Sequence, residues 1–379
     1  MKNLIKRINR IFQDYMRVKR LKIGKYIWDR KEKAKIVEGD NFLKDNSIKS
    51  ILFLRYDGKI GDMIVNSLMF HEIKKVYPDI RIGVIARGAA IDIIKDNPNV
   101  DKIYKYYKDR KKIKDLALKI KEEKYDLLID FSEMLRVNQM MLINLCGARI
   151  NIGLDRKDWK LFDLSIESGK DFKWTEHITK RYLAYLIKLG LKKENIDISY
   201  DIYLEDEKKY EAFFNEIKES KKLILNPYGA SKHKSFNIET LENIITYLKD
   251  KDIAIILTYF GDKYKELEFL EKKYKYVYIP KKIESILDTA ILIKKSDYVI
   301  SPDTSIVHIA SAFNKKMITV YPPKGGKYGV DHLVWAPKSE YSRVIFCKDK
   351  IGNYDEIDIN TFNMEEMKEE ILKLINNSD

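Results

Sequence analysis

The sequence predicts an α/β protein with two Rossmann-like, doubly wound domains that face a cleft. Its 379 residues, 45% of them hydrophobic, are enough for two domains of ordinary size. Short apolar runs alternate with amphipathic stretches in two successive sets, which is the pattern of parallel βαβ units. Sheets of this kind bind ligands at the carboxyl ends of their strands. We therefore expect the functional site between the domains.

A basic amphipathic extension is expected over residues 1–48. Within residues 1–28, apolar side chains recur at helical spacing and Lys and Arg occupy most other positions. One interpretation is a helix lying on an anionic membrane surface, with Tyr26, Ile27 and Trp28 as further anchors. The other is a helix that docks on the protein core. The sequence leaves both open.

Composition indicates a cytoplasmic protein. Cys146 and Cys347 lie far apart and show no metal-ligand spacing, which indicates a reducing compartment. The longest apolar runs have strand length, well short of the ~20 residues of a membrane-spanning helix. The start of the chain lacks the pattern of a secretory signal. A net charge of +14 implies anionic partners, which could be nucleic acid, membrane headgroups or phosphorylated substrates.

The first domain is expected over residues 49–204. Its apolar runs predict strands at 51–54, 82–86 and 125–130, with helices ending near Val76 and covering 134–145. The pattern weakens between 151 and 203. We interpret that zone as loops on the acceptor side that lead to a linker.

The second domain is expected over residues 205–361, followed by a last helix within 362–379. Strands are predicted at 223–226, 253–258, 298–300 and 317–321, and helices at 238–250, at 262–273 and after the third of these strands. The last helix, at about 362–376, is expected to pack back across the first domain.

The turn after the first predicted strand carries an acid. Gly58 and Gly61 allow a tight backbone there, and Asp62 follows at the mouth of the expected cleft. Asp62 could serve as a general base or could simply cap the helix. The glycines are spaced GxxG, and neither GxGxxG nor a P-loop is present at this turn, which disfavours nicotinamide and Walker-type ATP chemistry.

A second turn of interest opens a helix at residues 301–308. Thr304 and Ser305 offer hydroxyl and backbone N–H groups suited to a diphosphate, although the same residues form ordinary helix caps. His308 comes one turn later, where it could reach the phosphates or be a core residue.

A third turn, at residues 226–234, combines turn-forming residues with cations. Its Lys232 and Lys234 could neutralise a leaving diphosphate, or could lie in a solvated loop. No Asp-x-Asp follows a strand, so we expect chemistry without an obligatory metal or other cofactor.

These segments resemble glycosyltransferase family 9, the lipopolysaccharide heptosyltransferases. Residues 55–62 are similar to the family's Arg-x-(Asp/Ser)-x-Ile-Gly-Asp, and residues 97–101 to its Asn-Pro-x-Val-Asp. Residues 303–310 are similar to Asp-Thr-Gly-x-x-His-x-Ala. The resemblance covers about 50–330. Two departures stand out: Ser305 replaces the usual Gly, and Gly58-Lys59 makes the first loop one residue longer.

The resemblance implies an inverting glycosyltransferase of the GT-B type. Together with the missing Asp-x-Asp and the basic amphipathic start, it leads us to expect a metal-independent enzyme at the inner face of the cytoplasmic membrane. It also implies an ADP-heptose-type donor and an anionic, lipid-linked acceptor, the Kdo-bearing lipid A core. By position, Asp62 would be the general base. The implied donor residues are Ser231, Lys234, Gly261 with nearby Glu266, Asp303, Thr304, Ser305 and His308, and those on the acceptor side are Arg55, Lys59 and Gly61.

Three alternatives stay open at this stage. The enzyme could use another nucleotide sugar in surface polysaccharide synthesis. It could be a nucleotide-sugar epimerase of the same fold, which needs no acceptor. The charge also permits a non-enzymatic protein that binds membranes or nucleic acid, but no helix-turn-helix, RRM or zinc pattern accompanies it, so nucleic acid is not expected as a partner.

Overall fold

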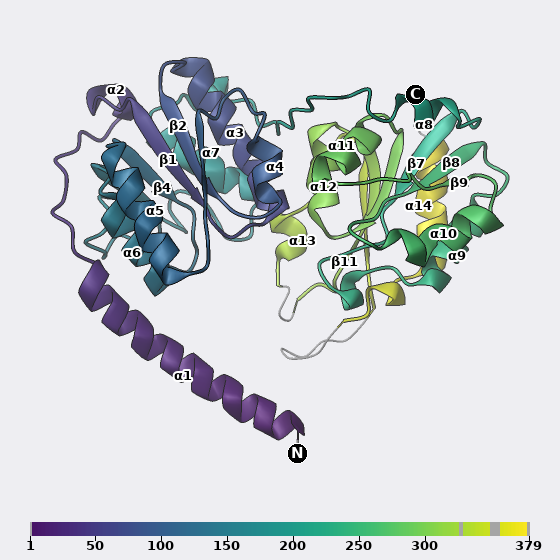
Figure 1. The fold of residues 1–379 in the computed structure, drawn as a ribbon, viewed down its shortest axis with the longest axis horizontal. Coiled ribbons are helices and arrows are strands. Elements are labelled where there is room, and N and C mark those ends of the chain that lie inside the picture. The colour runs from purple at the N-terminus through teal and green to yellow at the C-terminus, as the bar shows by residue number, and fades with distance from the viewer. Residues whose placement is uncertain (1, 326–328, 349–356, 377–379) are drawn as a thin grey trace.

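Two six-stranded parallel sheets, each covered by helices, form the body of the protein (Figure 1). The computed structural model describes residues 2–325, 329–348 and 357–376. Every pair of neighbouring strands in both sheets is parallel. The predicted pair of doubly wound α/β domains is therefore confirmed.

The first sheet has the strand order β3-β2-β1-β4-β5-β6. From β1 the chain winds outward to one edge of the sheet through β2 and β3, and it then returns to β4 on the other side of β1. Such a switch point leaves a crevice at the carboxyl ends of β1 and β4. The strands are β1 (Ser50–Arg55), β2 (Arg81–Ala86), β3 (Lys102–Lys105), β4 (Leu127–Asp130), β5 (Ile150–Leu154) and β6 (Leu164–Ile166).

Alternate residues of β1 pack on opposite faces of this sheet. Ile51 and Phe53 join the core beneath one set of helices, and Leu52 and Leu54 join the cluster on the other face. Because both faces are covered, the strand is apolar along nearly its whole length. The helices are α2 (Phe42–Asp45), α3 (Ile60–Val76), α4 (Ala90–Ile94), α5 (Arg110–Glu122), α6 (Val137–Cys146) and α7 (Ile178–Lys188).

The second sheet repeats this topology. Its order, β12-β11-β10-β7-β8-β9, is the same winding, with the switch point between β7 and β10. Its strands are β7 (Lys221–Leu225), β8 (Ile253–Leu257), β9 (Val277–Tyr278), β10 (Tyr298–Pro302), β11 (Lys316–Tyr321) and β12 (Ser342–Phe346). Its helices are α8 (Glu211–Asn215), α9 (Ile238–Tyr247), α10 (Tyr264–Lys273), α11 (Ile286–Lys294), α12 (Ser305–Ala312), α13 (Asp331–Val334) and α14 (Met364–Asn376).

The last helix does not pack back across the first domain as expected. α14 lies against β11, β12 and α9 of the second sheet (Figure 1). Its buried residues Met367, Ile371 and Leu374 recur at helical spacing and belong to the core of that half. Amphipathicity identified this helix, but it carries no information about which sheet the apolar face covers.

The zone from 151 to 203 is more regular than predicted. It contains most of β5, all of β6 and α7, and only then the linker. β6 has only three residues, too few to show an alternating pattern. α7 does carry an amphipathic pattern, with Lys180 and Lys188 at its more exposed positions, and the prediction of loops overlooked it.

Helix α1 (Lys2–Trp28) precedes these domains and runs along the lower side of the molecule in Figure 1. Its last turns lie against α6 of the first domain. Within the described part of the chain, no helix combines the length and apolar composition needed to cross a bilayer.

Candidate functional site

The two domains meet through the helices that follow their switch-point strands. α3 of the first domain lies against α12 of the second. At Gly61, an added Cβ would lie 2.6 Å from Cδ2 of His308, which is closer than such atoms approach. Only glycine lets the two helices come this near. The turns predicted in the separate domains are therefore neighbours in space.

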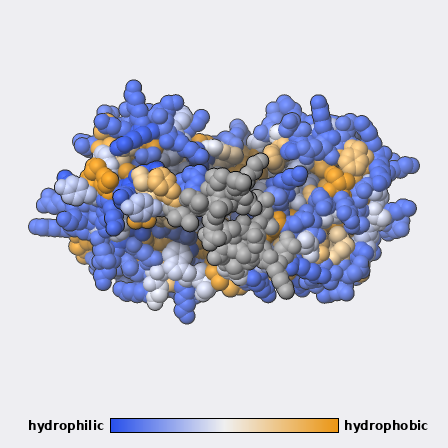
Figure 2. Space-filling model, turned by 90° about the horizontal axis from the view of Figure 1, so that it is seen from below, coloured by the Kyte–Doolittle hydropathy of each residue, from blue (hydrophilic) through white to orange (hydrophobic). Residues whose placement is uncertain are grey.

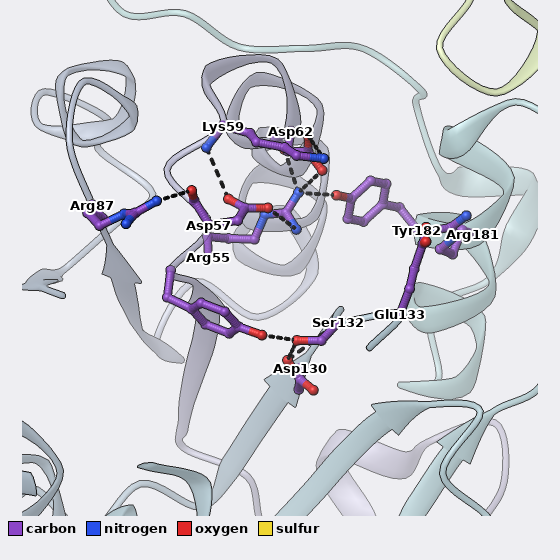
Figure 3. A network of polar contacts seen from close by, with 11 residues as sticks. Arg55, Asp57, Lys59, Asp62, Arg87, Asp130, Ser132, Glu133, Arg181 and Tyr182 are labelled. Carbon is purple, nitrogen blue, oxygen red and sulfur yellow. Dashed lines mark hydrogen bonds and ion pairs between the residues drawn. The ribbon is translucent and has the colours of Figure 1, made fainter. Parts of the chain in front are cut away.

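Asp62 lies in the first turn of α3 and is held by Arg55 from the end of β1 (Figure 3). The Arg55 Nη2 donates to the Asp62 carboxylate at 3.1 Å and to its main-chain carbonyl at 3.0 Å. The Asp62 side chain keeps 16% of its surface exposed. Arg55 thus fixes the orientation of this carboxylate, which remains accessible to solvent.

Arg55 lies beneath the site, not on its surface. It is buried, its Nη2 donates to the Tyr182 hydroxyl at 2.8 Å, and its guanidinium lies 5.2 Å from the centre of the Phe131 ring. Burial alone would lower the pKa of Arg55, but Tyr182 and the carboxylates of Asp62 and Asp57 outweigh it and raise that pKa. A permanently charged Arg55 sets the orientation of Asp62.

Lys59 is exposed at the start of α3. Its Nζ lies 3.8 Å from the Asp62 carboxylate, on the side opposite Arg55 (Figure 3). The preceding Gly58 has φ +75°, a conformation that accommodates the extra residue of this loop. Arg87 closes the loop by donating to the main-chain carbonyl of Asp57 at 2.6 Å.

Asp130, at the end of β4, is a buried acid that the sequence analysis did not single out. One of its oxygens accepts from the Ser132 backbone N–H at 3.2 Å, and the other has no hydrogen-bond partner among the described residues. Burial raises the pKa of Asp130. Tyr56 reaches the same corner through a hydrogen bond with the Ser132 hydroxyl.

The donor-side turn begins α12. Thr304 is its N-cap and accepts from the Ile306 backbone N–H at 3.2 Å, so the ordinary capping role is present. Ser305 is the first residue of the helix. The N-terminus of α12 still presents N–H groups and the positive end of the helix dipole, which suits an anion.

Lys234 and Asp303 form an ion pair across two turns of the second domain. The Lys234 Nζ lies 3.7 Å from the Asp303 carboxylate. Burial raises the pKa of Asp303, and the charge of Lys234 opposes this. Lys234 ends a short 3₁₀ helix (Lys232–Lys234) that begins after the exposed Ser231. Lys232, in contrast, is exposed on the same turn.

Asn226 ties the ends of three strands together in the donor domain. Its Nδ2 donates to the Ser301 hydroxyl at 2.9 Å, and its Oδ1 accepts from the Thr258 hydroxyl at 3.2 Å. It is buried. In the sequence, Asn226 is recognisable only as a polar residue directly after an apolar strand. Its hydrogen bonds to residues of the two neighbouring strands depend on the strand order of the sheet.

His308 is a buried residue at the domain boundary. Its ring lies against Trp335 and Tyr200, at 5.8 Å and 6.4 Å between ring centres. Its Nδ1 has no hydrogen-bond partner among the described residues. Burial, aided by His177, lowers the pKa of His308 to about 4. The imidazole is therefore neutral near pH 7 and adds no positive charge to the site.

Gly261 lies in an exposed loop after β8, with φ +57°. Nearby, Glu266 accepts a hydrogen bond from the Tyr228 hydroxyl at 3.4 Å, and the Tyr228 ring packs on Phe260 at 5.2 Å. These residues form an edge of the donor domain beyond the Lys234 turn, and the structure does not bring them to Asp62.

Two further charged residues near the domain boundary, Arg181 and Asp331, were missed in the sequence. Arg181 of α7 is buried, donates to the Glu133 carboxylate at 2.8 Å, and stacks 4.2 Å from the centre of the Trp174 ring. Asp331 of α13 is the other: its partly desolvated position raises its pKa, while Lys234 and Lys59 oppose this. Arg181 meets its partners within the first domain, and Asp331 approaches Lys234 within the second, but these contacts join residues far apart in the sequence.

Taken together, the geometry places the accessible carboxylate of Asp62 on one domain and the N-terminus of α12, which could hold an anion, on the other. Among the described residues, no group of three or more His, Cys, Asp and Glu side chains is arranged to hold a metal ion.

Comparison with known proteins points to one family. Residues 113–330 match the model of glycosyltransferase family 9 (heptosyltransferase). A lipopolysaccharide heptosyltransferase 1 of Campylobacter coli is 24% identical over 334 residues, which cover 83% of this chain and 95% of that protein.

Solved structures share the fold. A family 9 glycosyl transferase from Veillonella parvula superposes with a TM-score of 0.70 at 14% identity, covering 87% of this chain and 98% of that one. The Escherichia coli heptosyltransferase WaaC with ADP has a TM-score of 0.66 at 15% identity, covering 86% and 99%. Since the family match spans more than half of the sequence, the chain belongs to glycosyltransferase family 9, the heptosyltransferase family.

Proposed function

We propose that this enzyme transfers a heptose or a related sugar from an ADP-sugar to the Kdo and lipid A inner core of lipopolysaccharide. The observation that carries the proposal is the apposition of the Asp62 turn and the Thr304 turn, through the contact of Gly61 with His308. A base on one domain and a diphosphate site on the other are what transfer between two bound substrates requires.

In the proposed reaction, Asp62 accepts the proton of an acceptor hydroxyl. The hydroxyl oxygen forms a bond to the anomeric carbon while the bond from that carbon to the diphosphate oxygen breaks on the opposite face. The sugar configuration is inverted and the nucleoside diphosphate leaves with the bonding electron pair. Arg55 keeps the Asp62 carboxylate oriented throughout, since its guanidinium is fixed by Tyr182.

The leaving diphosphate gains negative charge, and we assign its stabilisation to fixed groups of the second domain. Lys234 supplies a cation, and the first turn of α12 supplies N–H donors at the positive end of a helix dipole. In this scheme Asp303 holds Lys234 in place until the diphosphate arrives. The scheme needs no metal ion.

The donor nucleotide is inferred as ADP. Solved structures of the same fold include heptosyltransferase WaaC with ADP and with ADP-2-deoxy-2-fluoro heptose. In this chain, Gly261, Glu266 and Tyr228 lie on the same domain as Lys234 and could border the ribose.

An anionic acceptor fits the first domain. Lys59 is exposed beside Asp62, and Arg181 lies behind the partly exposed Trp174. A cation beside an aromatic ring suits an acidic sugar, because the ring packs on the sugar face while the cation attracts its carboxylate. The net charge of +14 favours an acceptor held at an anionic surface.

Calorimetric titration with ADP-heptose, UDP-sugars and GDP-sugars tests the donor. We expect selective binding of the ADP-sugar, weakened at least tenfold in Lys234→Ala and in Thr304→Ala. Lys232→Ala is the matched control, because it removes an exposed lysine from the same turn and should bind as the wild type does. Preference for another nucleotide sugar would overturn the donor, and equal losses in both lysine variants would overturn the role of Lys234.

A further inference from the structure

Helix α1 has two faces, and only one is covered by the protein. Leu21, Gly24 and Trp28 face the first domain, where Leu21 and Trp28 pack on its second hydrophobic cluster. An added Cβ at Gly24 would lie 2.6 Å from Val137 of α6, so the backbone of α1 touches this helix closely. The docking interpretation of the sequence is therefore correct for this face.

Polar contacts fix the orientation of the docked end. The Lys25 Nζ lies 4.1 Å from the centre of the Trp159 ring. Just after the helix, the buried Asp29 carboxylate accepts from the Leu161 backbone N–H at 2.7 Å. Rotation of α1 about its axis would break these contacts, so the direction of its other face is set by the fold.

That other face presents a row of large apolar side chains to solvent. Phe12, Tyr15, Ile23 and Tyr26 leave 55–75% of their surface exposed. At about 100° per residue, these four fall within one side of the helix, opposite Leu21 and its docked neighbours. This exposed apolar row, in which Lys19 lies between Tyr15 and Ile23, marks an interaction surface.

The charge of α1 indicates the chemistry of the partner. The helix contains nine Lys and Arg residues and one acid, Asp14. Lys19 lies on the apolar side itself, with its Nζ 4.7 Å from the centre of the Tyr15 ring. Lysine stems can lie along an apolar surface while their ammonium groups reach anionic headgroups. Apolar and cationic groups on one face match an anionic bilayer.

The middle of α1 lies beside the loop that follows β4. The Arg17 guanidinium contacts the Met134 sulfur in the loop after β4, next to Glu133 at the acceptor side. Figure 1 shows α1 running from the first domain towards the middle of the molecule, and Figure 2 shows this side as largely hydrophilic with separate apolar patches. The helix is thus both a surface element and a neighbour of the candidate site.

We propose that the face of α1 formed by Phe12, Tyr15, Ile23 and Tyr26 lies on an anionic lipid bilayer and turns the acceptor side of the cleft towards it. The proposed orientation rests on the proposed function, because a lipid-linked acceptor must enter from the membrane. The membrane-binding face itself is inferred from the exposure and charge of α1 alone. A nucleic acid would use the basic residues but leave Phe12 and Ile23 uncovered.

Sedimentation of the full-length protein with vesicles tests the surface. The probes are vesicles of phosphatidylcholine alone and of phosphatidylcholine with an equal amount of phosphatidylglycerol. We expect the wild type to bind the anionic vesicles at least tenfold more tightly. A variant with Phe12→Gln, Tyr15→Gln, Ile23→Gln and Tyr26→Gln should lose at least tenfold in affinity. Glutamine retains helix propensity, so α1 should still form.

The matched control changes four exposed apolar residues elsewhere. Tyr107→Gln, Leu118→Gln, Ile187→Gln and Phe269→Gln remove side chains of similar size that leave 41–43% of their surface exposed. This control should bind anionic vesicles as the wild type does. Wild-type binding by the α1 variant, or equal losses in both variants, would overturn the proposal. So would a dimer in sedimentation velocity that only the α1 variant loses, because the face would then bind a second copy.

Fluorescence at two engineered cysteines tests the orientation. A polarity-sensitive dye at Met134→Cys, on the cleft-edge loop, should shift to the blue and be quenched by nitroxide lipids when vesicles are added. The same dye at Leu372→Cys, on α14 of the second domain, should change little. The reverse pattern would overturn the orientation. Neither vesicle experiment uses donor or acceptor, so its failure is distinct from failure of the ADP-sugar titration.

Discussion

The guanidinium of Arg55 donates to both the carboxylate and the main-chain carbonyl of Asp62, at 3.1 Å and 3.0 Å. This double contact joins the end of β1 to the first turn of α3. It fixes the side chain and the backbone of the acid together, so the carboxylate cannot swing away without breaking a charge-assisted hydrogen bond. The catalytic assignment of Asp62 makes a specific prediction about turnover.

Replacing Asp62 by Asn should abolish most turnover and leave donor binding intact. The amide keeps the size of the side chain and a hydrogen-bonding oxygen but cannot accept the acceptor proton. A positioned general base contributes about 10²–10⁴-fold, or roughly 3–5 kcal/mol of barrier. Steady-state kinetics and ADP-sugar titration measure the two effects separately. Asp79→Asn, an exposed acid in the turn before β2, is the control and should keep wild-type turnover; near-normal turnover in Asp62→Asn would refute the assignment.

Tyr182 should act on catalysis only through Arg55. Tyr182→Phe removes the hydroxyl that accepts from Arg55 at 2.8 Å, which loosens the group that orients Asp62. We expect kcat to fall about tenfold, with little change in donor affinity. The free energy of unfolding should fall by about 1–2 kcal/mol, the contribution of a buried hydrogen bond.

The matched control for Tyr182 is its neighbour Tyr185. Both are buried on α7, and the Tyr185 hydroxyl donates to the Asp130 carbonyl at 2.9 Å, away from Arg55. Tyr185→Phe should lose similar stability in urea denaturation but keep the wild-type kcat. Equal losses of kcat in the two variants would mean that Tyr182 matters for packing alone.

Much of the fold could be predicted from sequence because both sheets are buried on two faces. Strands such as β1 and β8 are runs of apolar residues, and the long helices between them are amphipathic. The short strands β6 and β9 carry too few residues for a period, and the amphipathic pattern of α7 lies in a zone whose strands are too short to indicate a βαβ unit. The sheet partner of α14 depended on tertiary packing that no local pattern encodes.

The candidate site was partly predictable for a similar reason. Turns that follow strands can be identified in a sequence, and three site residues lie in such turns: Asp62, Lys234 and Thr304. Arg55 was also noticed, but its burial beneath Asp62 depends on Tyr182, which lies 127 residues further along the chain. Asp331 lies near Lys234 of its own domain and near Lys59 of the other, and one sequence contains no signal for such contacts between distant residues.

Gly61→Ala should disturb the contact between the domains. The added methyl would meet the His308 ring at 2.6 Å, so α3 and α12 would have to move apart. We expect kcat/KM to fall at least tenfold, because the base and the diphosphate site would no longer be aligned. The same substitution in a His308→Ala background has room for the methyl and should cost much less. Independent, additive losses in the double variant would show that the two residues are not coupled.

His308 should make the protein less stable in acid. Its pKa is lowered to about 4 by burial, whereas an unfolded chain has a histidine pKa of about 6.5. The unfolded state therefore binds a proton between these values and the folded state does not, so the stabilisation is complete above about pH 6.5 and is lost as the pH falls towards 4. From pH 7.5 to 4.5, this linkage amounts to about 2–3 kcal/mol.

Urea denaturation at these two pH values measures the effect in the wild type and in His308→Gln. The variant lacks the ring that resists protonation, so its loss of stability on acidification should be smaller by that amount. His233→Gln removes an exposed histidine of the same domain and should retain the wild-type dependence. If His308→Gln loses as much unfolding free energy between pH 7.5 and 4.5 as the wild type does, the buried imidazole is not the group that resists protonation. The neutral role assigned to His308 at the domain contact would then have to be abandoned.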